Sequence, residues 1–143
     1  MIAVGRREFL GICGGAAACI ATGGCASVMV QRVTATGGSV RLTIARHPEL
    51  RATDGVLAIQ PEGFTDPILV LRVGDDRYAA LSPICTHRGC TVEPSGDRLE
   101  CPCHGSTYDR EGRVLIGPAE RALSRYPAVV EGDTLVISVG GAR

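Results

Sequence analysis

Two short runs near the middle of the chain carry residue types that bind transition metals. Each run pairs a cysteine with a histidine two or three residues later, and 13 residues separate the pairs: Cys85 with His87, and Cys101 with His104. Two thiolates and two imidazoles suit an iron–sulfur cluster in which sulfur binds one iron and nitrogen binds the other. The chain has three histidines in all, and the third, His47, lies beside a proline in a polar stretch. The two runs therefore predict a [2Fe–2S] cluster.

Two other uses of these residues explain part of the pattern. A structural zinc ion accepts two Cys and two His in a tetrahedron. A zinc finger presents its histidines from a helix, however, and here each His lies in a loop that is rich in Gly and Pro. Zinc also leaves two neighbouring cysteines, Cys90 and Cys103, without a role. A framework of disulfides would use the four cysteines but leaves the two histidines unexplained.

The pattern resembles that of the Rieske family of iron–sulfur proteins, and the sequences that carry it are CTHRGC at residues 85–90 and CPCHGS at residues 101–106. The resemblance extends over residues 37–139. It implies that Cys90 and Cys103 form a disulfide that ties the two loops together. Ferredoxins that supply dioxygenases usually lack this disulfide, so the resemblance points to the high-potential, cytochrome bc-type branch of the family.

The resemblance assigns the four metal ligands to two irons. Cys85 and Cys101 would bind the inner iron as thiolates, whereas His87 and His104 would bind the outer iron through nitrogen. Because neutral imidazoles replace two thiolates, such a cluster takes up an electron easily, at potentials of roughly −150 to +300 mV. If the electron donor is a quinol, the resemblance gives the two histidines a catalytic role, since one of them would take the proton of the quinol.

Two neighbours of the second run also match the high-potential branch. Ser106 and Tyr108 stand at the motif positions where Ser and Tyr donate hydrogen bonds to cluster sulfurs, which stabilises the more negative reduced state. Without the motif beside them, the serine would be assigned to a turn and the tyrosine to a half-buried strand. Residues 117–119, Gly-Pro-Ala, resemble the proline loop that shields the cluster from water in this family.

One position departs from the cytochrome bc pattern. The residue after the first histidine ligand is usually a leucine, at an apolar tip that docks over the quinol, whereas this chain has Arg88. A charged tip suits docking on an acidic protein surface better than insertion into an apolar pocket. The segment between the uncharged N-terminal stretch and the first predicted strand is also short, covering residues 31–36.

The function that these features imply is that of an exported, high-potential Rieske protein that carries one electron at a time. The setting that fits best is the iron–sulfur subunit of a quinol–cytochrome c reductase-like complex, with b-type and c-type cytochromes as partners and quinol as a donor. One alternative is a small subunit of a periplasmic oxidase, similar to arsenite oxidase, with the large subunit as its partner. Another is a free-standing electron carrier. The sequence names no donor or acceptor, and it leaves open whether the chain is part of an enzyme.

The N-terminal 32 residues are predicted to be a targeting segment. Arg6 and Arg7, followed by Glu-Phe-Leu, resemble the twin-arginine export signal, which carries folded, cofactor-loaded proteins across a membrane. Residues 9–30 carry no charge, and 22 residues are long enough to span a bilayer, which needs about 20. The segment is predicted to stay as an anchor helix, with lipidation at Cys25 and simple cleavage as alternatives. Each outcome places the domain of residues 33–143 on the periplasmic side, where a disulfide can form.

The elements that must position the motif are short strands. β-Branched runs bounded by Gly, Pro and Asp predict strands at residues 40–45, 56–59, 68–73, 78–81, 98–101, 106–109, 114–116, 126–130 and 135–139. Residues 48–54 have room for one helical turn. The formal net charge is zero and there is no basic stripe, which argues against nucleic acid as a partner. We expect an all-β sandwich or barrel of small antiparallel sheets, with the two cluster-binding loops at one tip.

Overall fold

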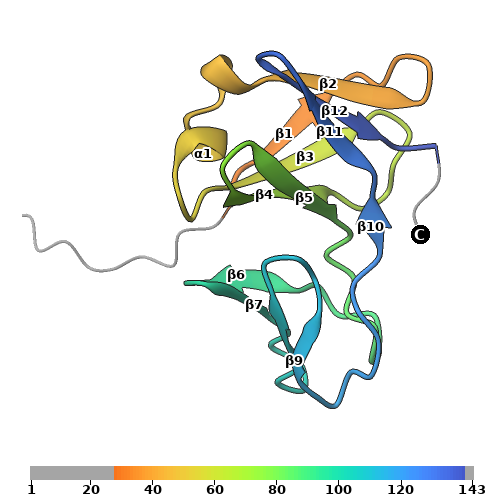
Figure 1. Ribbon diagram of the computed structural model, residues 1–143. Coiled ribbons are helices and arrows are strands. Elements are labelled where there is room, and N and C mark those ends of the chain that lie inside the picture. The colour runs from red at the N-terminus through yellow and green to blue at the C-terminus, as the bar shows by residue number, and fades with distance from the viewer. Residues whose placement is uncertain (1–27, 141–143) are drawn as a thin grey trace, which may run out of the picture.

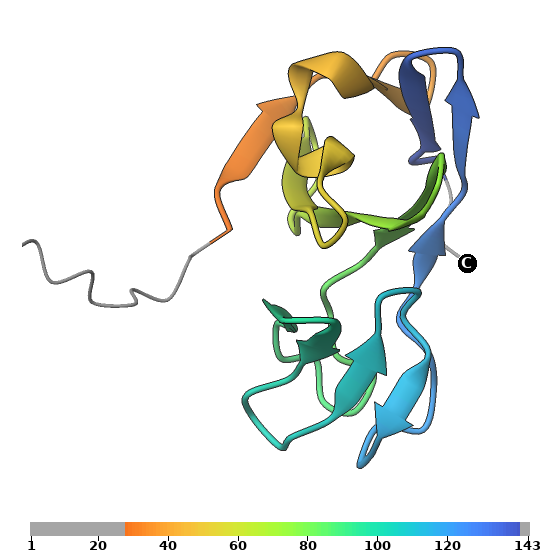
Figure 2. The same cartoon turned by 60° about the vertical axis from the view of Figure 1, so that its left-hand side comes forward.

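The computed structural model describes residues 28–140. They form two β bodies, which lie one above the other in Figure 1. We call residues 28–81 and 125–140 the basal body, and residues 82–124 the tip body. Figure 2 shows that the chain crosses from the basal body to the tip body and back again. The tip body is therefore an insertion between two strands of the basal body.

The basal body contains two sheets. The strands of the larger sheet are β1 (Val30–Val33), β3 (Val56–Pro61), β4 (Ile68–Gly74), β5 (Arg77–Leu81) and β10 (Arg125–Tyr126), in the order β1-β3-β4-β5-β10. β1 runs parallel to β3, and the other neighbours are antiparallel. The strands of the smaller, antiparallel sheet are β2 (Ser39–Thr43), β11 (Ala128–Glu131) and β12 (Thr134–Ser138), in the order β11-β12-β2.

The central part of the larger sheet, around β4, is buried on both of its faces. Successive side chains of a strand point to opposite faces, so the side chains of β4 contribute alternately to two cores. Ile68 and Val70 pack against the smaller sheet of the basal body. Leu69 and Leu71 pack against residues of the tip body. β4, the central strand of the basal body, thus also packs against the tip body that contains the two loops.

A short helical segment closes one end of the basal body. The 3₁₀ turn η1 (Ile44–Arg46) leads into α1 (Pro48–Arg51), a single turn that starts on a proline, as helices often do. Leu50 of this turn is completely buried in the basal core. The Tyr78 hydroxyl donates a hydrogen bond to the Leu50 carbonyl at 3.0 Å, which fixes the turn to β5. The single turn agrees with the prediction for this stretch.

The tip body is a small antiparallel sheet of three-residue strands, which are β6 (Glu93–Ser95), β7 (Arg98–Glu100), β8 (Thr107–Asp109) and β9 (Val114–Ile116). Each strand pairs with the next one in the chain. Its buried residues include Leu99 and Tyr108, which are cross-strand partners, together with Val92 and Leu123. These four side chains pack against the face of the larger sheet that carries Leu69 and Leu71, and they form one core with it.

The all-β prediction is confirmed, and most of the predicted strands are found in the structure. The strand predicted at residues 126–130 is divided at Pro127 into β10 and β11, which belong to different sheets, and the strand predicted at residues 40–45 ends at Thr43, where η1 follows. The sequence did not predict β1 or β6. β1 has exposed side chains and pairs in parallel with β3, so neither alternation nor a hairpin turn marks it. β6 contains Pro94, which argues against a strand in sequence analysis but is tolerated at the edge position that β6 occupies.

The predicted N-terminal segment falls mostly before the described part of the chain. Arg6, Arg7 and Cys25 all lie outside the described residues. β1 begins at Val30, so the last residues of the predicted segment belong to the basal sheet. Within residues 28–140, no helix has the length and the apolar character that crossing a membrane requires.

Candidate metal centre

Two loops with the same backbone turn hold the four predicted ligands. In each loop the glycine four residues after the cysteine donates its amide to the cysteine carbonyl, Gly89 to Cys85 at 2.8 Å and Gly105 to Cys101 at 3.0 Å. The cysteine amide in turn donates to the carbonyl five residues further on, at 2.8 Å in both loops. Both glycines have positive φ angles, 78° and 77°, which other residues adopt at a cost. The sequence thus builds one local structure twice.

Cys85 and Cys101, the free cysteines among residues 28–140, form the inner part of the site. Cys85 is 3% exposed and Cys101 is 1% exposed, and both belong to the core that the two bodies share. Their side chains lie within hydrogen-bonding reach of each other. The structure therefore brings together the two thiols that the sequence predicts to bind one iron.

The two histidines form the outer part of the site. The rings of His87 and His104 lie 4.8 Å apart between centroids and meet edge to face, at 88°. The Nδ1 atom of His87 is buried and has no hydrogen-bond partner among the described residues. A buried polar atom normally has a partner, because leaving it without one is unfavourable. A metal ion that accepts this lone pair would satisfy it, so the residues present fit an imidazole-bound iron.

The donors are thus arranged as a pair of sulfurs and a pair of imidazoles. Within residues 28–140, no three side chains of His, Cys, Asp or Glu are placed to share a single metal ion. Two ligands for each of two irons is the arrangement of a [2Fe–2S] centre with mixed ligation.

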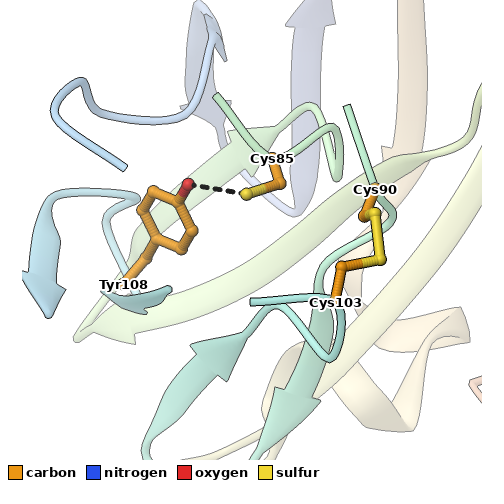
Figure 3. The surroundings of a disulfide bond; sticks show 4 residues. All are labelled: Cys85, Cys90, Cys103 and Tyr108. Carbon is orange, nitrogen blue, oxygen red and sulfur yellow. Dashed lines mark hydrogen bonds between the residues drawn. A yellow bond between two sulfur atoms is a disulfide. The ribbon is translucent and has the colours of Figure 1, made fainter. Parts of the chain in front are cut away.

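A disulfide joins the two loops beside the ligands. Cys90 and Cys103 are bonded, with an S–S distance of 2.06 Å, and Figure 3 shows the bond next to Cys85. The predicted disulfide is confirmed. It links the loop after β5 to the loop after β7, so neither loop can move away from the other while it is intact.

Tyr108 approaches the inner sulfur pair from β8. Its side chain is completely buried, and its hydroxyl oxygen lies 3.3 Å from the Cys85 sulfur, as Figure 3 shows. The Thr86 amide donates to the same hydroxyl oxygen at 3.3 Å. Burial raises the pKa of Tyr108, and the neighbouring Cys85 raises it further. The tyrosine therefore keeps its proton and can donate it to sulfur.

Ser106 occupies a second donor position. Its side chain is completely buried, and its hydroxyl oxygen accepts a hydrogen bond from the Ala119 amide at 3.0 Å. Because that contact uses a lone pair of the oxygen, the hydroxyl proton stays available to the neighbouring Cys85 sulfur. Ala119 belongs to the Gly-Pro-Ala segment at residues 117–119, so this hydrogen bond also holds the predicted proline loop against the site.

The pKa values of the two thiols are shifted in opposite directions. Burial raises the pKa of both, since it disfavours the charged form. At Cys85, hydrogen bonds from Tyr108, from the His87 amide, from Cys101 and from Ser106 outweigh burial and lower the pKa. At Cys101 burial prevails, and the neighbouring Cys85 adds to the rise in pKa. Cys85 is therefore the thiol of this pair that ionises first.

Arg110 is a positioning residue that was not predicted from the sequence. It lies in the turn between β8 and β9, and its Nη2 atom donates to the Gly55 carbonyl of the basal body at 2.8 Å. Its Nε atom donates to the Arg72 carbonyl, also in the basal body, at 3.4 Å. One guanidinium thus bridges the two bodies. No motif marks this arginine, because its acceptors are backbone atoms far away in the sequence.

The surface beside the loops is partly charged and partly apolar. Arg88 is exposed, and within residues 28–140 it takes part in no ion pair. Leu115 and Ile116 of β9 are 56% and 57% exposed, although large apolar side chains are usually buried. Ile116 pairs with Thr107, the first residue after the second loop, so the apolar pair flanks the site.

Comparisons with known proteins agree with this geometry. A family model described as Rieske [2Fe-2S] domain matches residues 32–127. The cytochrome b6-f complex iron-sulfur subunit 2 of Synechocystis sp. strain PCC 6803 is 40% identical over 111 residues, which are 73% of this chain and 59% of that protein. The cytochrome b6-f complex iron-sulfur subunit of Synechococcus sp. strain JA-2-3B'a(2-13) is 39% identical over 121 residues, which are 82% of this chain and 67% of that protein.

A solved structure shows the same similarity in three dimensions. The cyanobacterial plasma membrane Rieske protein PetC3 from Synechocystis PCC 6803 superposes with a TM-score of 0.55 and 33% identity, over 64% of this chain and 92% of that one. The chain spans only 59% of the length of the Synechocystis b6-f subunit, so the likeness concerns the domain that contains both loops.

Proposed function

The chain belongs to the Rieske [2Fe–2S] family, and from this premise we propose that it is the electron-transfer subunit of a quinol–cytochrome c reductase-like complex. As a member of that family it binds a [2Fe–2S] cluster, which takes up and returns one electron at a time. The observation that carries the proposal is the environment of Cys85, a buried thiol that faces the hydroxyl groups of Tyr108 and Ser106. Donors directed at a sulfur favour its more negative state, and so raise the reduction potential.

The ligand assignment follows the two pairs of side chains. Cys85 and Cys101 hold one iron through their sulfurs, and His87 and His104 hold the other through ring nitrogens. The unpartnered Nδ1 atom of His87 supports this assignment, because metal binding supplies the partner that the fold does not. His104 is exposed, so it is the ligand that a partner or a quinol reaches first. In quinol oxidation the ring nitrogen of His104 that does not bind iron, once deprotonated, would accept one proton of the quinol as the cluster takes up one electron.

The relatives support a respiratory or photosynthetic complex as the setting. Those described above are iron–sulfur subunits of cytochrome b6-f complexes and a plasma membrane Rieske protein. By analogy the chain works with cytochromes in a membrane complex, and it receives electrons from quinol and passes them to a c-type cytochrome. Because the chain spans only part of the length of the b6-f subunit, these partners are a proposal that rests on the similarity of the matched domain.

A second candidate function rests on Arg88. This exposed arginine, without an ion pair within residues 28–140, stands where the cytochrome bc pattern has a leucine. A positive charge beside the ligands favours an acidic protein surface over an apolar quinol pocket, because opposite charges steer association. That chemistry fits the small electron-transfer subunit of a periplasmic oxidase.

The names of the relatives support an association of this chain with a membrane. We also propose the route by which the chain is exported. Arg6 and Arg7 direct twin-arginine export, and the uncharged residues that follow keep the chain at the periplasmic face of the membrane. Replacing both arginines (Arg6→Lys with Arg7→Lys) should leave a folded, cluster-bearing protein in the cytoplasm. Fractionation of cells that express this variant checks the route, and unchanged export of the double variant would contradict it.

Membranes from cells that lack the chain test the function itself. They should lose quinol-dependent reduction of a c-type cytochrome, and the wild-type chain should restore it. The variant Arg88→Leu should keep or increase this activity if the tip docks over quinol. If the chain instead supplies an oxidase, quinol-dependent reduction survives in the deleted membranes, and Arg88→Leu slows electron transfer to the acidic partner.

A further inference from the structure

The Tyr108 hydroxyl has more neighbours than it has protons. Its oxygen lies 3.3 Å from the Cys85 sulfur, 3.3 Å from the Thr86 amide nitrogen and 3.2 Å from the Thr86 hydroxyl oxygen. The amide can only donate, so it occupies a lone pair of the tyrosine oxygen. The single tyrosine proton is then left with two possible acceptors, the sulfur and the Thr86 hydroxyl.

A fourth contact decides the direction of the bond between the two hydroxyls. The Thr86 hydroxyl lies 2.6 Å from the carbonyl oxygen of Arg121, which can only accept. The threonine proton is therefore directed to that carbonyl. Because its proton is used there, the Thr86 oxygen faces Tyr108 as an acceptor, in direct competition with the Cys85 sulfur.

We propose that Thr86 tunes the reduction potential by competing with the Cys85 sulfur for the Tyr108 proton. The inference rests on the proposed function, because it requires a cluster bound at Cys85. In the oxidised protein the sulfur is a weak acceptor, and the tyrosine proton is shared with the threonine oxygen. Once an electron is added, the sulfur becomes more negative and draws the proton to itself. Thr86 thus stabilises the oxidised state and holds the potential below the value that Tyr108 alone would set.

The proposal makes an unusual prediction of sign. Removing a hydroxyl beside the cluster should raise the potential, because the oxidised state loses its alternative hydrogen bond while the reduced state loses little. Valine has the branched shape of threonine without the hydroxyl. Thr86→Val should make reduction about two- to fivefold more favourable, which is roughly 20 to 40 mV for a one-electron couple. Thr86→Ser keeps the hydroxyl and should leave the potential unchanged.

A double-mutant cycle separates this role from a structural one. The contact with Arg121 also ties the first loop to the segment after the proline loop, and its loss alone would act without Tyr108. If Thr86 acts through the tyrosine proton, Thr86→Val has no effect on the potential in a Tyr108→Phe background. An equal effect in both backgrounds, an unchanged potential or a fall in potential would each overturn the proposal.

Vibrational spectroscopy gives a readout that loop packing does not move. Resonance Raman spectra of the oxidised holoprotein in D₂O report hydrogen bonds to sulfur through shifts of the Fe–S bands. The shift should be larger in Thr86→Val than in the wild type, and Thr86→Ser should match the wild type. Equal shifts in all three proteins would contradict the competition. Analysis of iron and sulfide in the same samples keeps the two proposals apart, since a wild-type protein without a cluster would refute the proposed function instead.

Discussion

The basal body and the tip body are stabilised by different means. In the basal body, the core between the two sheets is aliphatic, with Ile59, Leu135 and Ile137 completely buried. In the tip body the buried side chains include two cysteines and a tyrosine. Among residues 28–140, the buried polar side chains, Ser106 and Thr107, both lie in the tip body. One body is built to be stable, and the other is built to place polar groups around a buried pair of sulfurs.

The difference shows what a small metal-binding body needs from its support. Strands of three residues bury too little apolar surface to be stable alone, and small units commonly use disulfides or metals as well. The tip body has a disulfide, a core shared with the basal sheet, and Arg110, which reaches the basal carbonyls. Changes in the tip should therefore affect the cluster first, and changes in the base should affect stability first.

The largest effect is expected from the disulfide. Replacing both cysteines (Cys90→Ala with Cys103→Ala) frees two loops that are 13 residues apart in the chain. A crosslink of that loop size contributes about 3 kcal/mol by chain entropy. We expect the cluster to be lost more readily than in the wild type while the basal body stays folded, as followed by visible absorption and circular dichroism. Loss of both signals together would show that the two bodies are one cooperative unit.

The basal core should give the largest change in stability. Leu135 is completely buried, and Leu135→Ala should lower the free energy of unfolding by about 2–5 kcal/mol. Val129, on the neighbouring strand, is 61% exposed, so Val129→Ala should change it by less than about 0.5 kcal/mol. Denaturant unfolding measures both values. The reduction potential of Leu135→Ala should equal that of the wild type below the transition, and a shifted potential would contradict the division of roles.

The pH dependence of stability should arise partly in the tip body, at Asp109. Burial by itself raises the pKa of Asp109, but the amides of Arg113 and Glu111 and the Arg113 guanidinium outweigh it and lower the pKa. A depressed pKa stabilises the fold above the ordinary carboxyl value of about 3.9, and this contribution is lost as the pH falls through the folded-state value. Asp109→Asn should lower stability by about 1–2 kcal/mol at pH 7.

A matched variant makes this test specific. Among residues 28–140, Asp97 pairs only with its neighbour Arg98, and it is largely exposed, so Asp97→Asn should change neither the stability nor its pH dependence. Unfolding measured between pH 7 and pH 3 distinguishes the variants. If Asp97→Asn and Asp109→Asn behave alike, the hydrogen bonds at Asp109 contribute nothing beyond surface charge.

The smallest effects are expected from the two hydroxyl donors, and they concern the potential. A hydrogen bond to a charged group contributes about 1.5–3 kcal/mol, which corresponds to roughly 65–130 mV if the bond exists only in the reduced state. The donors also touch the oxidised site, so Ser106→Ala and Tyr108→Phe should each lower the potential by several tens of millivolts. Their effects should add only approximately. Redox titration measures both, and an unchanged potential in both variants would mean that these side chains are purely structural.

Much of the site could be predicted because it is local in the sequence. Cys85 and His87 lie within one loop turn, and so do Cys101 and His104. The same backbone turn is formed at both places. The disulfide could be predicted because Cys90 belongs to the same motif. The alternating strands of the basal body could be predicted because a period of two follows directly from strand geometry.

The remainder depends on contacts between distant parts of the chain. Arg110 donates to carbonyls 38 and 55 residues away. Because the acceptors are backbone atoms, no pattern of side chains in the sequence indicates these contacts. β1 joins the sheet through a parallel pairing that has no hairpin to mark it. The role of Thr86 depends on the Arg121 carbonyl, which accepts the Thr86 hydroxyl proton, and only the folded structure shows this contact.

Metal and sulfide analysis of the purified protein, together with electron paramagnetic resonance, tests the central claim most directly. The account predicts two irons and two sulfides per chain and, after reduction, a spectrum with the low average g-value that mixed nitrogen and sulfur ligation produces. Replacing His104 with cysteine (His104→Cys) should raise that average toward the value of clusters bound only by sulfur. Stoichiometric zinc without iron in protein prepared without oxygen, or a wild-type spectrum typical of ligation by four cysteines, would contradict the account.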